Sequence, residues 1–362
     1  MNNIKDLYID NSLIGSHQGD TLFDDVYIEH NSLPEINLSD IDTTTEFMGS
    51  NFSFPLIISS MIGGTERGLE INEILVSIAQ DLNIPIELGS QQENIASDEQ
   101  SKLYLSEIDD DLEKNVFILS NLSAKASEEE VKIAMDQVKA KALSLYINPA
   151  QEAISFDHAA DFEGVLANIE KLVSIYGDKI LVKEKAMGMS QETIKKLVSA
   201  GVSYIDLSGY GGSNFIEIEN LRNYRNDFSD MYGWGIPTAK SILNARAVSQ
   251  DVKIIASGGI RTSLDIIKAL ILGADYVAVA GELLKYLVHG GYDHAKLYLE
   301  GLIEKTKILM FLLGAKNLEE LRRVPYKLTG KLKEISEWQI LMQKENKPFL
   351  TWKQMKIHRW KM

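Results

Sequence analysis

The sequence predicts an α/β fold: a TIM (β/α)8 barrel with an N-terminal extension and a C-terminal helical cap. Eight short apolar runs recur along the chain, and stretches with apolar residues at helical spacing separate most of them. Eight strands alternating with helices favour a closed barrel over an open doubly wound sheet. The length of 362 residues exceeds the roughly 250 of a plain barrel, so additional segments are expected.

The same patterns place the individual elements. Strands are expected at residues 56–60, 84–88, 116–120, 142–147, 180–183, 204–207, 253–256 and 276–279. Helices are expected at residues 68–82, 127–141, 162–176, 190–200, 239–247 and 264–272, with cap helices at 295–313 and 317–323. We therefore divide the chain into an N-terminal segment packing on the barrel (1–50, with a short strand at 23–28), the barrel with its cap helices (51–335) and a C-terminal tail (336–362).

Two segments stand outside the repeat of strands and helices. Residues 209–237 form a long connection rich in aromatic and polar side chains, and connections of this length in compact domains are often functional. We expect either a lid over the active-site mouth or a packed surface insertion. The basic, aromatic tail at 344–362 could contact nucleic acid, a membrane or an acidic partner. A frayed terminus or an oligomer contact is the preferred interpretation.

Composition excludes several classes of function. The absence of cysteine excludes disulfides, thiolate catalysis and Cys-based metal or iron–sulfur sites. A net charge of −15 argues against general binding to nucleic acid or acidic membranes. No run approaches the roughly 18 apolar residues of a membrane span, and the N-terminus lacks the pattern of a signal peptide. We therefore expect a cytoplasmic protein without a nucleic-acid or membrane partner, in which an anionic substrate would need a locally basic pocket.

A tight turn near the end of the expected barrel has the composition of a phosphate site. Residues 257–261 read Ser-Gly-Gly-Ile-Arg, and the last expected strand runs into Ala280 and Gly281. Glycine lets the backbone approach phosphate oxygens, and the N–H groups at a helix start carry partial positive charge. Two ordinary loops that turn on glycine are the alternative. A phosphate site is favoured because Arg261 adds a fixed cation and a second glycine turn follows at the expected distance.

Polar and small residues end the other expected strands, where a barrel places its active site. These residues are 59–65, 89–92, 120–121, 148–152, 183–184 and 208–213. Their hydroxyl and amide groups, one lysine and a phosphate site suit FMN. A lysine beside the pyrimidine end of the ring stabilises the charge of a reduced flavin, and Asn and Ser hydrogen-bond its edge. Taken alone, Lys183 could instead be an ion-paired lysine at a strand end.

Metal-binding and acid–base candidates are few. Glu152, next to Gln151, could hold a divalent cation through a carboxylate oxygen and water, or could be solvated or paired. None of the six histidines falls at an expected strand end. We therefore expect neither a histidine base nor a histidine metal cluster.

Several motifs together resemble those of the type 2 isopentenyl-diphosphate isomerases, which use FMN. The likeness covers roughly residues 3–335. In the family's order, the motifs are Leu-Pro-Glu-Ile at 33–36, Ile-Asp-Thr-Thr-Thr-Glu-Phe at 41–47, Ile-Ser-Ser-Met-Ile-Gly-Gly-Thr at 58–65, Asn-Pro-Ala-Gln-Glu at 148–152, Val-Lys-Glu at 182–184, Trp-Gly-Ile-Pro-Thr at 234–238, Ser-Gly-Gly-Ile-Arg-Thr at 257–262 and Phe-Leu-Leu-Gly-Ala-Lys-Asn-Leu at 311–318.

The resemblance implies a TIM barrel that binds FMN and Mg²⁺, uses NAD(P)H to reduce the flavin, and assembles as a homotetramer or homo-octamer. It also implies a reaction that moves a double bond between isopentenyl and dimethylallyl diphosphate, with reduced FMN as the acid and base and no net redox change.

Carried over motif by motif, the resemblance assigns roles to individual residues. FMN contacts are expected from Ser60, Met61, Ile62, Ser90, Asn121, Lys183 and Ser213, and contacts to its phosphate from Gly258, Gly259, Ile260, Arg261, Ala280 and Gly281. Gln151 would be the catalytic residue beside the substrate, and Glu152 would bind Mg²⁺. The residues expected to contact the substrate are Lys5, Tyr8, Gln92, Tyr146, Asn148 and Gln151.

Three cationic or potentially cationic ligands that the family uses for the diphosphate are missing. The Arg of an N-terminal Arg–Lys pair becomes Ile4, an Arg after the second strand becomes Gln92, and a His after the fourth becomes Tyr146. Ile62 also replaces a Thr of the flavin motif. Each charge-assisted hydrogen bond to a phosphate contributes roughly 1.5–3 kcal/mol, so these losses could lower diphosphate affinity on the order of a thousandfold. The flavin site is kept, whereas the diphosphate pocket is remodelled and less positive.

Three functions are consistent with this pattern. The first is an FMN-dependent isomerase in which Mg²⁺, Lys5, Tyr8 and Tyr146 suffice for the diphosphate. The second is a diverged paralogue, an FMN-dependent oxidoreductase or dehydrogenase that acts on a substrate without a diphosphate, such as a peptide. The third is a non-catalytic, flavin-binding partner subunit. The family match favours the first function, and the altered pocket residues favour the second.

Overall fold

The computed structural model describes residues 9–11, 13, 19–92, 95, 104–105, 114–155, 160–221 and 226–345. Eight parallel strands close into a barrel in chain order, and the last pairs with the first. The strands are β4 (Leu56–Ile58), β5 (Ile86–Glu87), β6 (Ile118–Ser123), β7 (Ala142–Ile147), β8 (Ile180–Glu184), β9 (Tyr204–Asp206), β10 (Lys253–Ala256) and β11 (Tyr276–Val279). The expected TIM barrel is confirmed, and each expected strand overlaps an observed one.

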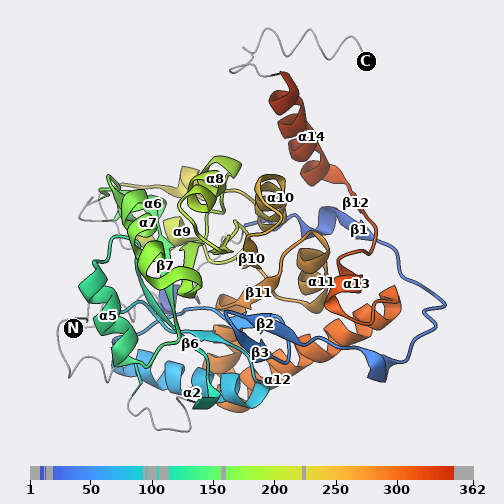
Figure 1. Ribbon diagram of the computed structural model, residues 1–362, viewed down its shortest axis with the longest axis horizontal. Coiled ribbons are helices and arrows are strands. Elements are labelled where there is room, and N and C mark those ends of the chain that lie inside the picture. Colours follow the sequence, from blue (N-terminus) through green and yellow to red (C-terminus); the bar gives the residue numbers. More distant parts are fainter. Residues whose placement is uncertain are drawn as a thin grey trace.

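Helices surround the barrel, as Figure 1 shows. They are α2 (Glu66–Leu82), α5 (Glu128–Gln137), α6 (Pro149–Ile154), α7 (Val165–Tyr176), α8 (Gln191–Ser199), α9 (Phe215–Asn220), α10 (Thr238–Val248), α11 (Ser263–Ile271), α12 (Gly281–Leu313), α13 (Leu318–Leu321) and α14 (Gly330–Glu345). Polar residues fix several helix starts: Ser127 and Thr262 form capping boxes, and Thr65 and Ser190 cap α2 and α8. Within the described ranges, no helix is long and apolar enough to cross a membrane.

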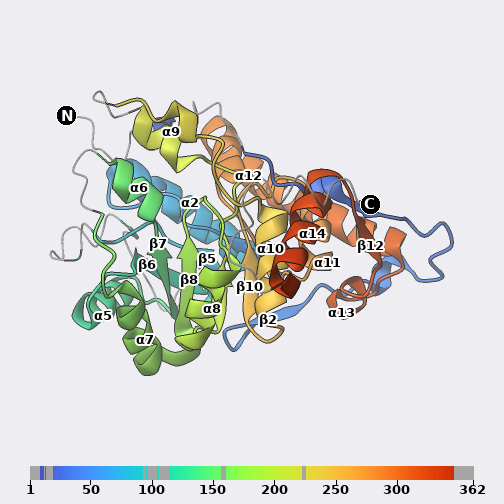
Figure 2. The ribbon, with the colours of Figure 1, turned by 90° about the horizontal axis from the view of Figure 1, so that it is seen from above.

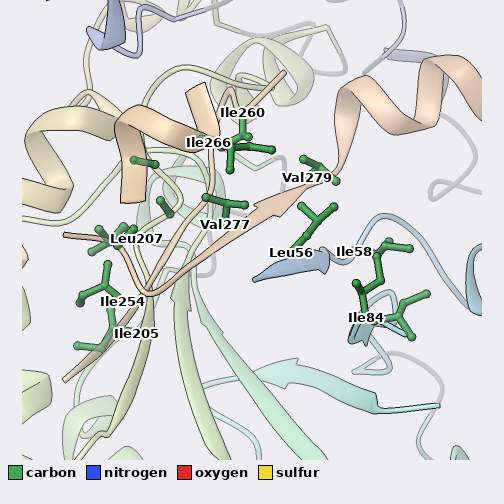
Figure 3. Close-up of a cluster of buried hydrophobic side chains, with 14 of the residues drawn as sticks. Leu56, Ile58, Ile84, Ile205, Leu207, Ile254, Ile260, Ile266, Val277 and Val279 are labelled. Carbon is green, nitrogen blue, oxygen red and sulfur yellow. The ribbon is translucent and has the colours of Figure 1, made fainter. Parts of the chain in front are cut away.

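Apolar side chains of the strands pack against those of the helices. Figure 3 shows part of this core, with Leu56 and Ile58 from β4, Val277 and Val279 from β11, and Ile266 from α11. All five are almost fully buried. Strands of a parallel barrel are covered on both faces and therefore appear as continuous apolar runs in a sequence. This burial explains why the eight runs could be located without a structure.

A hairpin closes the amino-terminal end of the barrel. β2 (Thr45–Phe47) pairs antiparallel with β3 (Ser50–Phe52). The fully buried Phe47 ring packs edge-on against Tyr204 and Tyr276, with ring centres 5.4 and 5.0 Å apart. Because these tyrosines begin β9 and β11, the hairpin plugs the end of the barrel opposite the polar strand ends.

The two terminal segments meet outside the barrel. The strand expected at 23–28 is shorter, because Phe23–Asp25 forms a 3-10 turn before β1 (Val26–Ile28). β1 pairs antiparallel with β12 (Tyr326–Leu328). The cap helix expected at 295–313 is the second half of α12, which kinks at Gly291, where φ is 62°. α14 follows β12 and extends away from the barrel (Figure 1).

Candidate active site

A cavity of about 460 Å³ lies at the carboxyl ends of the barrel strands, within the range of about 300–1,000 Å³ typical of small-molecule sites. α6 and α9 lie at this end of the barrel (Figure 2). Every residue expected to contact FMN lines the cavity: Ser60, Met61, Ile62, Ser90, Asn121, Lys183, Ser213, Gly258, Gly259, Ile260, Arg261, Ala280 and Gly281. Gln92, Tyr146, Asn148, Gln151 and Glu152 also line it. Lys5 and Tyr8, like Ile4, lie outside the described residues.

Two glycine turns contact each other closely at the end of this cavity where the sequence predicts a phosphate site. Gly258 and Gly259 have φ values of 92° and 85°, which other residues rarely adopt. A Cβ on Gly258 would lie 2.0 Å from the Gly209 carbonyl oxygen, and one on Gly259 would lie 2.3 Å from that of Gly211. Both positions therefore require glycine. Arg261 stabilises the contact between the two turns, because its Nη2 donates to the Gly211 carbonyl oxygen at 2.7 Å.

The two helices that begin beside these turns differ in their capping. At the start of α11, the Asp265 carboxylate accepts from the backbone N–H groups of Arg261 and Thr262 at 3.0 and 2.8 Å. The residue before α12, Ala280, has no capping side chain. The first turn of α12, beginning at Gly281, is therefore better suited to an incoming anion than that of α11.

Lys183 lies between two carboxylates at the floor of the cavity. Its Nζ is 2.6 Å from Glu87 Oε2 and 3.4 Å from Asp206 Oδ2, and it donates to Ser59 Oγ at 2.8 Å. The Lys183 side chain is 7 % exposed, and each carboxylate side chain is 2 % exposed. Lys183 is therefore both an ion-paired lysine at a strand end and part of the cavity lining.

These three groups alter one another's protonation. Burial would raise the pKa of Glu87, but the attraction of the Lys183 ammonium and the hydrogen bonds to the carboxylate together outweigh burial and lower the pKa. Burial would lower the pKa of Lys183, but Glu87 and Asp206 outweigh it and the pKa of Lys183 is raised. Burial raises the pKa of Asp206, against the opposing attraction of Lys183. Glu87 and Lys183 are therefore both charged at neutral pH.

Glu184, the next residue along β8, is a buried carboxyl group in the cavity wall. Its Oε2 accepts from the N–H groups of Met187 and Gly188 at 2.5 and 3.2 Å. Burial raises the pKa of Glu184 to about 8, against the opposing effect of these two hydrogen bonds. Glu184 is therefore mostly neutral at pH 7.

Two buried amide oxygens in the cavity wall have no hydrogen-bond donor among the described residues. They are Oδ1 of Asn121 and Oδ1 of Asn148. A buried acceptor without a donor costs about 1–3 kcal/mol, so each of these oxygens points to a donor that a ligand would bring. The pyrimidine ring of a flavin carries an N–H donor and carbonyl oxygens, which suit Asn121 and Lys183. The donor and acceptor set therefore fits FMN.

At the substrate end of the cavity, polar side chains bond one another. Gln92 Nε2 donates to Glu130 Oε1 at 3.1 Å, and Gln92 Oε1 accepts from the Ser123 N–H at 3.2 Å. The Ser90 hydroxyl donates to Tyr146 Oη at 3.3 Å. The two residues that stand where the family has an Arg and a His are thus neutral and hydrogen-bonded within the protein.

Lys185 brings a cation to this end of the cavity. Its Nζ lies 5.1 Å from the centre of the Tyr146 ring and 4.8 Å from that of the Phe215 ring, which is cation–π distance. The residue is half-buried and lines the cavity.

The expected catalytic residue, Gln151, is buried and held by two neighbours. Its Nε2 donates to Glu219 Oε1 at 2.8 Å, and its Oε1 accepts from Asn148 Nδ2 at 3.5 Å. Glu219 belongs to α9, whose side chains at positions 216–219 are buried. The long connection at 209–237 therefore supplies a packed wall of the cavity, and this wall holds Gln151 in place.

Glu152 also lines the cavity, but it is paired with a lysine. Lys125 Nζ lies 2.5 Å from Glu152 Oε2. In the part of the chain that the structure describes, no three His, Cys, Asp or Glu side chains are grouped to hold a metal. Glu152 is the carboxylate expected to bind Mg²⁺, and the ion would need most of its oxygen ligands from water and substrate.

The sequence interpretation missed Glu87, Asp206 and Lys185. The first two had a signal, because a carboxylate inside an apolar barrel strand is rarely buried without a partner. That signal would have pointed to Lys183, the one basic residue among the eight expected strand ends facing the site. Lys185 had no such signal, because its contact with Tyr146 depends on how two neighbouring strands turn their last side chains into the cavity.

Comparison with known proteins identifies the family of the chain. Residues 111–326 match the model of a family described as FMN-dependent dehydrogenase. The chain is 36 % identical to an isopentenyl-diphosphate delta-isomerase of Pyrococcus furiosus, over 89 % of this chain and 84 % of that protein. Proteins of the same name from Bacillus pumilus and a Geobacillus species are 35 and 37 % identical, covering 92 and 89 % of this chain and 93 and 92 % of theirs.

Solved structures share the barrel at lower identity. A crystal structure of a mandelate oxidase variant with 2-hydroxy-phenylacetamide aligns with a TM-score of 0.61 at 18 % identity, covering 90 % of this chain and 98 % of that one. Another variant, with the monooxide FMN adduct, gives 0.59 at 18 % identity, covering 88 and 92 %. These likenesses support the fold, whereas the sequence relatives are closer and match most of the chain. The chain therefore belongs to the isopentenyl-diphosphate delta-isomerase family of FMN-dependent enzymes.

Proposed function

We propose that the chain binds FMN and interconverts isopentenyl and dimethylallyl diphosphate. The observation that carries the proposal is one cavity that joins a turn requiring glycine, a buried lysine and two unpartnered amide oxygens, in a member of this family. Reduced FMN, when bound, would supply the acid and base of the double-bond shift. The protein would hold flavin and alkene in register and exclude water.

The two ends of FMN would be held by different kinds of group. Backbone N–H groups near Gly259 and Gly281 would bind the phosphate, with Arg261 keeping the turn in place. Asn121 and Lys183 would bind the pyrimidine edge, because both line the cavity and lie together through Glu87. Gln151, held by α9, would lie beside the substrate.

Lys185 is the cation that we propose for the substrate's diphosphate. Gln92 and Tyr146 offer no charge, and Lys185 Nζ lies over the Tyr146 ring. Turning toward a phosphate would give Lys185 a charge-assisted hydrogen bond of roughly 1.5–3 kcal/mol, which would offset part of the loss of the family's cations. Lys5 would add a second cation.

The remaining requirements follow from the family resemblance. Glu152, whose Oε2 is paired with Lys125, would help to hold Mg²⁺, and the ion would supply positive charge for the diphosphate. NAD(P)H would reduce the flavin. A cytoplasmic homotetramer or homo-octamer, with no nucleic-acid or membrane partner, completes the proposal.

The test is a direct assay of the FMN-loaded protein. The flavin is reduced anaerobically, isopentenyl diphosphate and Mg²⁺ are added, and dimethylallyl diphosphate is measured. We expect product from the wild type and more product from a Gln92→Arg, Tyr146→His variant, which restores the family's cations. If the wild type forms no product at high enzyme concentration, the isomerase proposal is wrong. If the wild type forms product efficiently and the double variant forms no more, then the loss of cations at these two positions does not affect the activity.

A second function, an FMN-dependent oxidoreductase acting on a substrate without a diphosphate, is favoured by one specific observation. Gln92 and Tyr146 are neutral and already hydrogen-bonded, and buried Glu217 and Glu219 line the same end of the cavity. Carboxylates repel a diphosphate but tolerate an uncharged or cationic substrate, such as a peptide. Reduction of the bound FMN by such a substrate, together with no isomerase product, would establish this function.

A further inference from the structure

Glu87 lies behind Lys183 as seen from the cavity. Lys183 lines the cavity, whereas Glu87 is not among the lining residues and is 4 % exposed. Four donors converge on the Glu87 carboxylate. Its Oε2 accepts from Lys183 Nζ at 2.6 Å, from the Ser60 N–H at 3.0 Å and from the Ser59 hydroxyl at 3.1 Å, and its Oε1 accepts from Asn121 Nδ2 at 3.2 Å.

The carboxylates beside Lys183 cancel its positive charge, so the lysine exerts little electrostatic attraction on a ligand in the cavity. Glu87 cancels the ammonium at 2.6 Å, and Asp206 lies 3.4 Å from the same Nζ. Asp206 is itself held by the Ser257 hydroxyl at 2.5 Å. With both carboxylates ionised, the group of Glu87, Lys183 and Asp206 carries a charge of −1 in a site with little water to screen it. A ligand in the cavity therefore meets a lysine whose field is cancelled.

We propose that Glu87 sets the reduction potential of bound FMN by cancelling the charge of Lys183. The inference rests on the FMN-binding part of the proposed function and is independent of the isomerase activity. Two-electron reduction of FMN with one proton gives an anion, and reduction with two protons gives the neutral form. A free ammonium at the pyrimidine edge would stabilise the anion. When the charge of the ammonium is cancelled, reduction of FMN is less favourable, and the reduced flavin keeps its second proton. Glu87 acts through Lys183, so it is a positioning residue.

The test is a redox titration of the FMN-loaded protein with Glu87→Gln. The substitution removes the negative charge and keeps the size of the side chain. The glutamine oxygen can accept the three hydrogen bonds that Oε2 accepts in the wild type, and only the bond from Asn121 Nδ2 to Oε1 is lost. We expect the affinity for reduced FMN relative to oxidised FMN to rise at least tenfold, which makes the two-electron potential about 30 mV more positive. The absorbance of the reduced protein should change from the neutral to the anionic form.

Two further variants complete the experiment. Glu192→Gln removes an exposed carboxylate paired with Lys196 on the outer helix α8, and it should leave the potential unchanged. Lys183→Met removes the lysine itself. The two carboxylates then lose their shared counter-ion. Asp206, whose pKa burial already raises, takes up a proton, whereas Glu87 keeps the donors of Ser59, Ser60 and Asn121. The charge of the group therefore stays at −1, and the potential should move less than in Glu87→Gln. The comparison of Lys183→Met with the wild type can be made even if Glu87→Gln does not fold.

The outcomes separate the inference from the proposed function. A wild type that takes up no FMN would overturn both. FMN that binds but has the same potential in Glu87→Gln and Glu192→Gln would overturn the inference alone. So would a Lys183→Met variant whose relative affinity for reduced FMN falls by tenfold or more, because Lys183 would then act as an uncancelled cation.

Discussion

The two ends of the cavity differ in their contacts. At the glycine turns, where we propose that the FMN phosphate binds, the contacts are made by backbone. At the proposed substrate end, they are made by side chains that bond one another. Gly258 and Gly259 press against the carbonyl groups of the turn at 209–211, where a Cβ does not fit. Gln92 and Tyr146 make hydrogen bonds that several polar residues could make. Where backbone contacts leave no room for a Cβ, a single substitution must move the turn. Where side chains make the contacts, a single substitution can alter the site and leave the backbone in place. Within one family, the cofactor end is therefore constrained and the substrate end is open to change.

The largest effect is expected from Gly259→Ala, which tests whether the glycine turns are as constrained as this comparison implies. The new Cβ would lie 2.3 Å from the Gly211 carbonyl oxygen at a φ of 85°, so the phosphate turn must move. We expect FMN affinity to fall about a thousandfold, on the order of 4 kcal/mol, measured by titration of flavin fluorescence. Gly233→Ala is the matched control, because nothing lies within 4 Å of its Cβ position. Unchanged FMN binding in Gly259→Ala would show that the phosphate end is not rigid.

A smaller effect concerns the buried carboxyl between the two ends. The pKa of Glu184 is raised from 4.5 to about 8, so the folded protein holds a proton that the unfolded chain has released. This contribution to stability is complete below pH 4.5 and is lost as the pH rises through 8. We expect the wild type to lose on the order of 3 kcal/mol more than Glu184→Gln between pH 5 and 8.5. The measurement is urea unfolding across this range, and parallel pH profiles for the two proteins would contradict it.

Lys185→Met tests the proposed substrate end separately from the glycine turns. Removing the proposed diphosphate cation should lower kcat/KM for isopentenyl diphosphate roughly ten- to hundredfold, or about 1.5–3 kcal/mol. FMN affinity should stay the same, because Lys185 lies with Tyr146 and Phe215 and not with the glycine turns. Lys195→Met, an exposed lysine on α8, controls for the loss of charge. Equal kinetics for the two variants would remove Lys185 from the substrate site.

The smallest effect is expected at Glu152. Its pair with Lys125 is partly exposed, so Lys125→Met should change the free energy of unfolding by less than about 1 kcal/mol. The freed carboxylate should bind Mg²⁺ about threefold more tightly in the presence of substrate, measured as the Mg²⁺ concentration for half-maximal rate. A weaker Mg²⁺ response would mean that Lys125, and not Glu152, serves the phosphate.

The two ends of the cavity also differ in how far the sequence predicts them. The turn at 257–261 could be placed because two adjacent glycines before a helix have few structural explanations, and positive φ values account for both. The barrel strands could be placed because burial on both faces makes them apolar throughout. The family resemblance was confirmed by relatives that match most of the chain.

The partners of several side chains in the site resisted prediction because these contacts join distant segments of the chain. Gln151 is bonded to Glu219, 68 residues away, and Lys183 to Glu87, 96 residues away. A local pattern carries no record of such pairs, since many polar residues could satisfy the same hydrogen bonds. β12 and the hairpin β2–β3 were not expected for a different reason: strands of three residues are too short to give a periodic signal.

The pairing of β1 with β12 has a consequence for the order in which the molecule is assembled. Thr329 donates through its N–H and its hydroxyl to the Asp25 carbonyl oxygen, 304 positions earlier in the chain. A ribosome adds about 5–20 residues per second, so β1 emerges roughly 15–60 s before its partner exists. During that interval β1 has an unsatisfied edge. β1 therefore reaches its final place only after all the barrel strands have been synthesised.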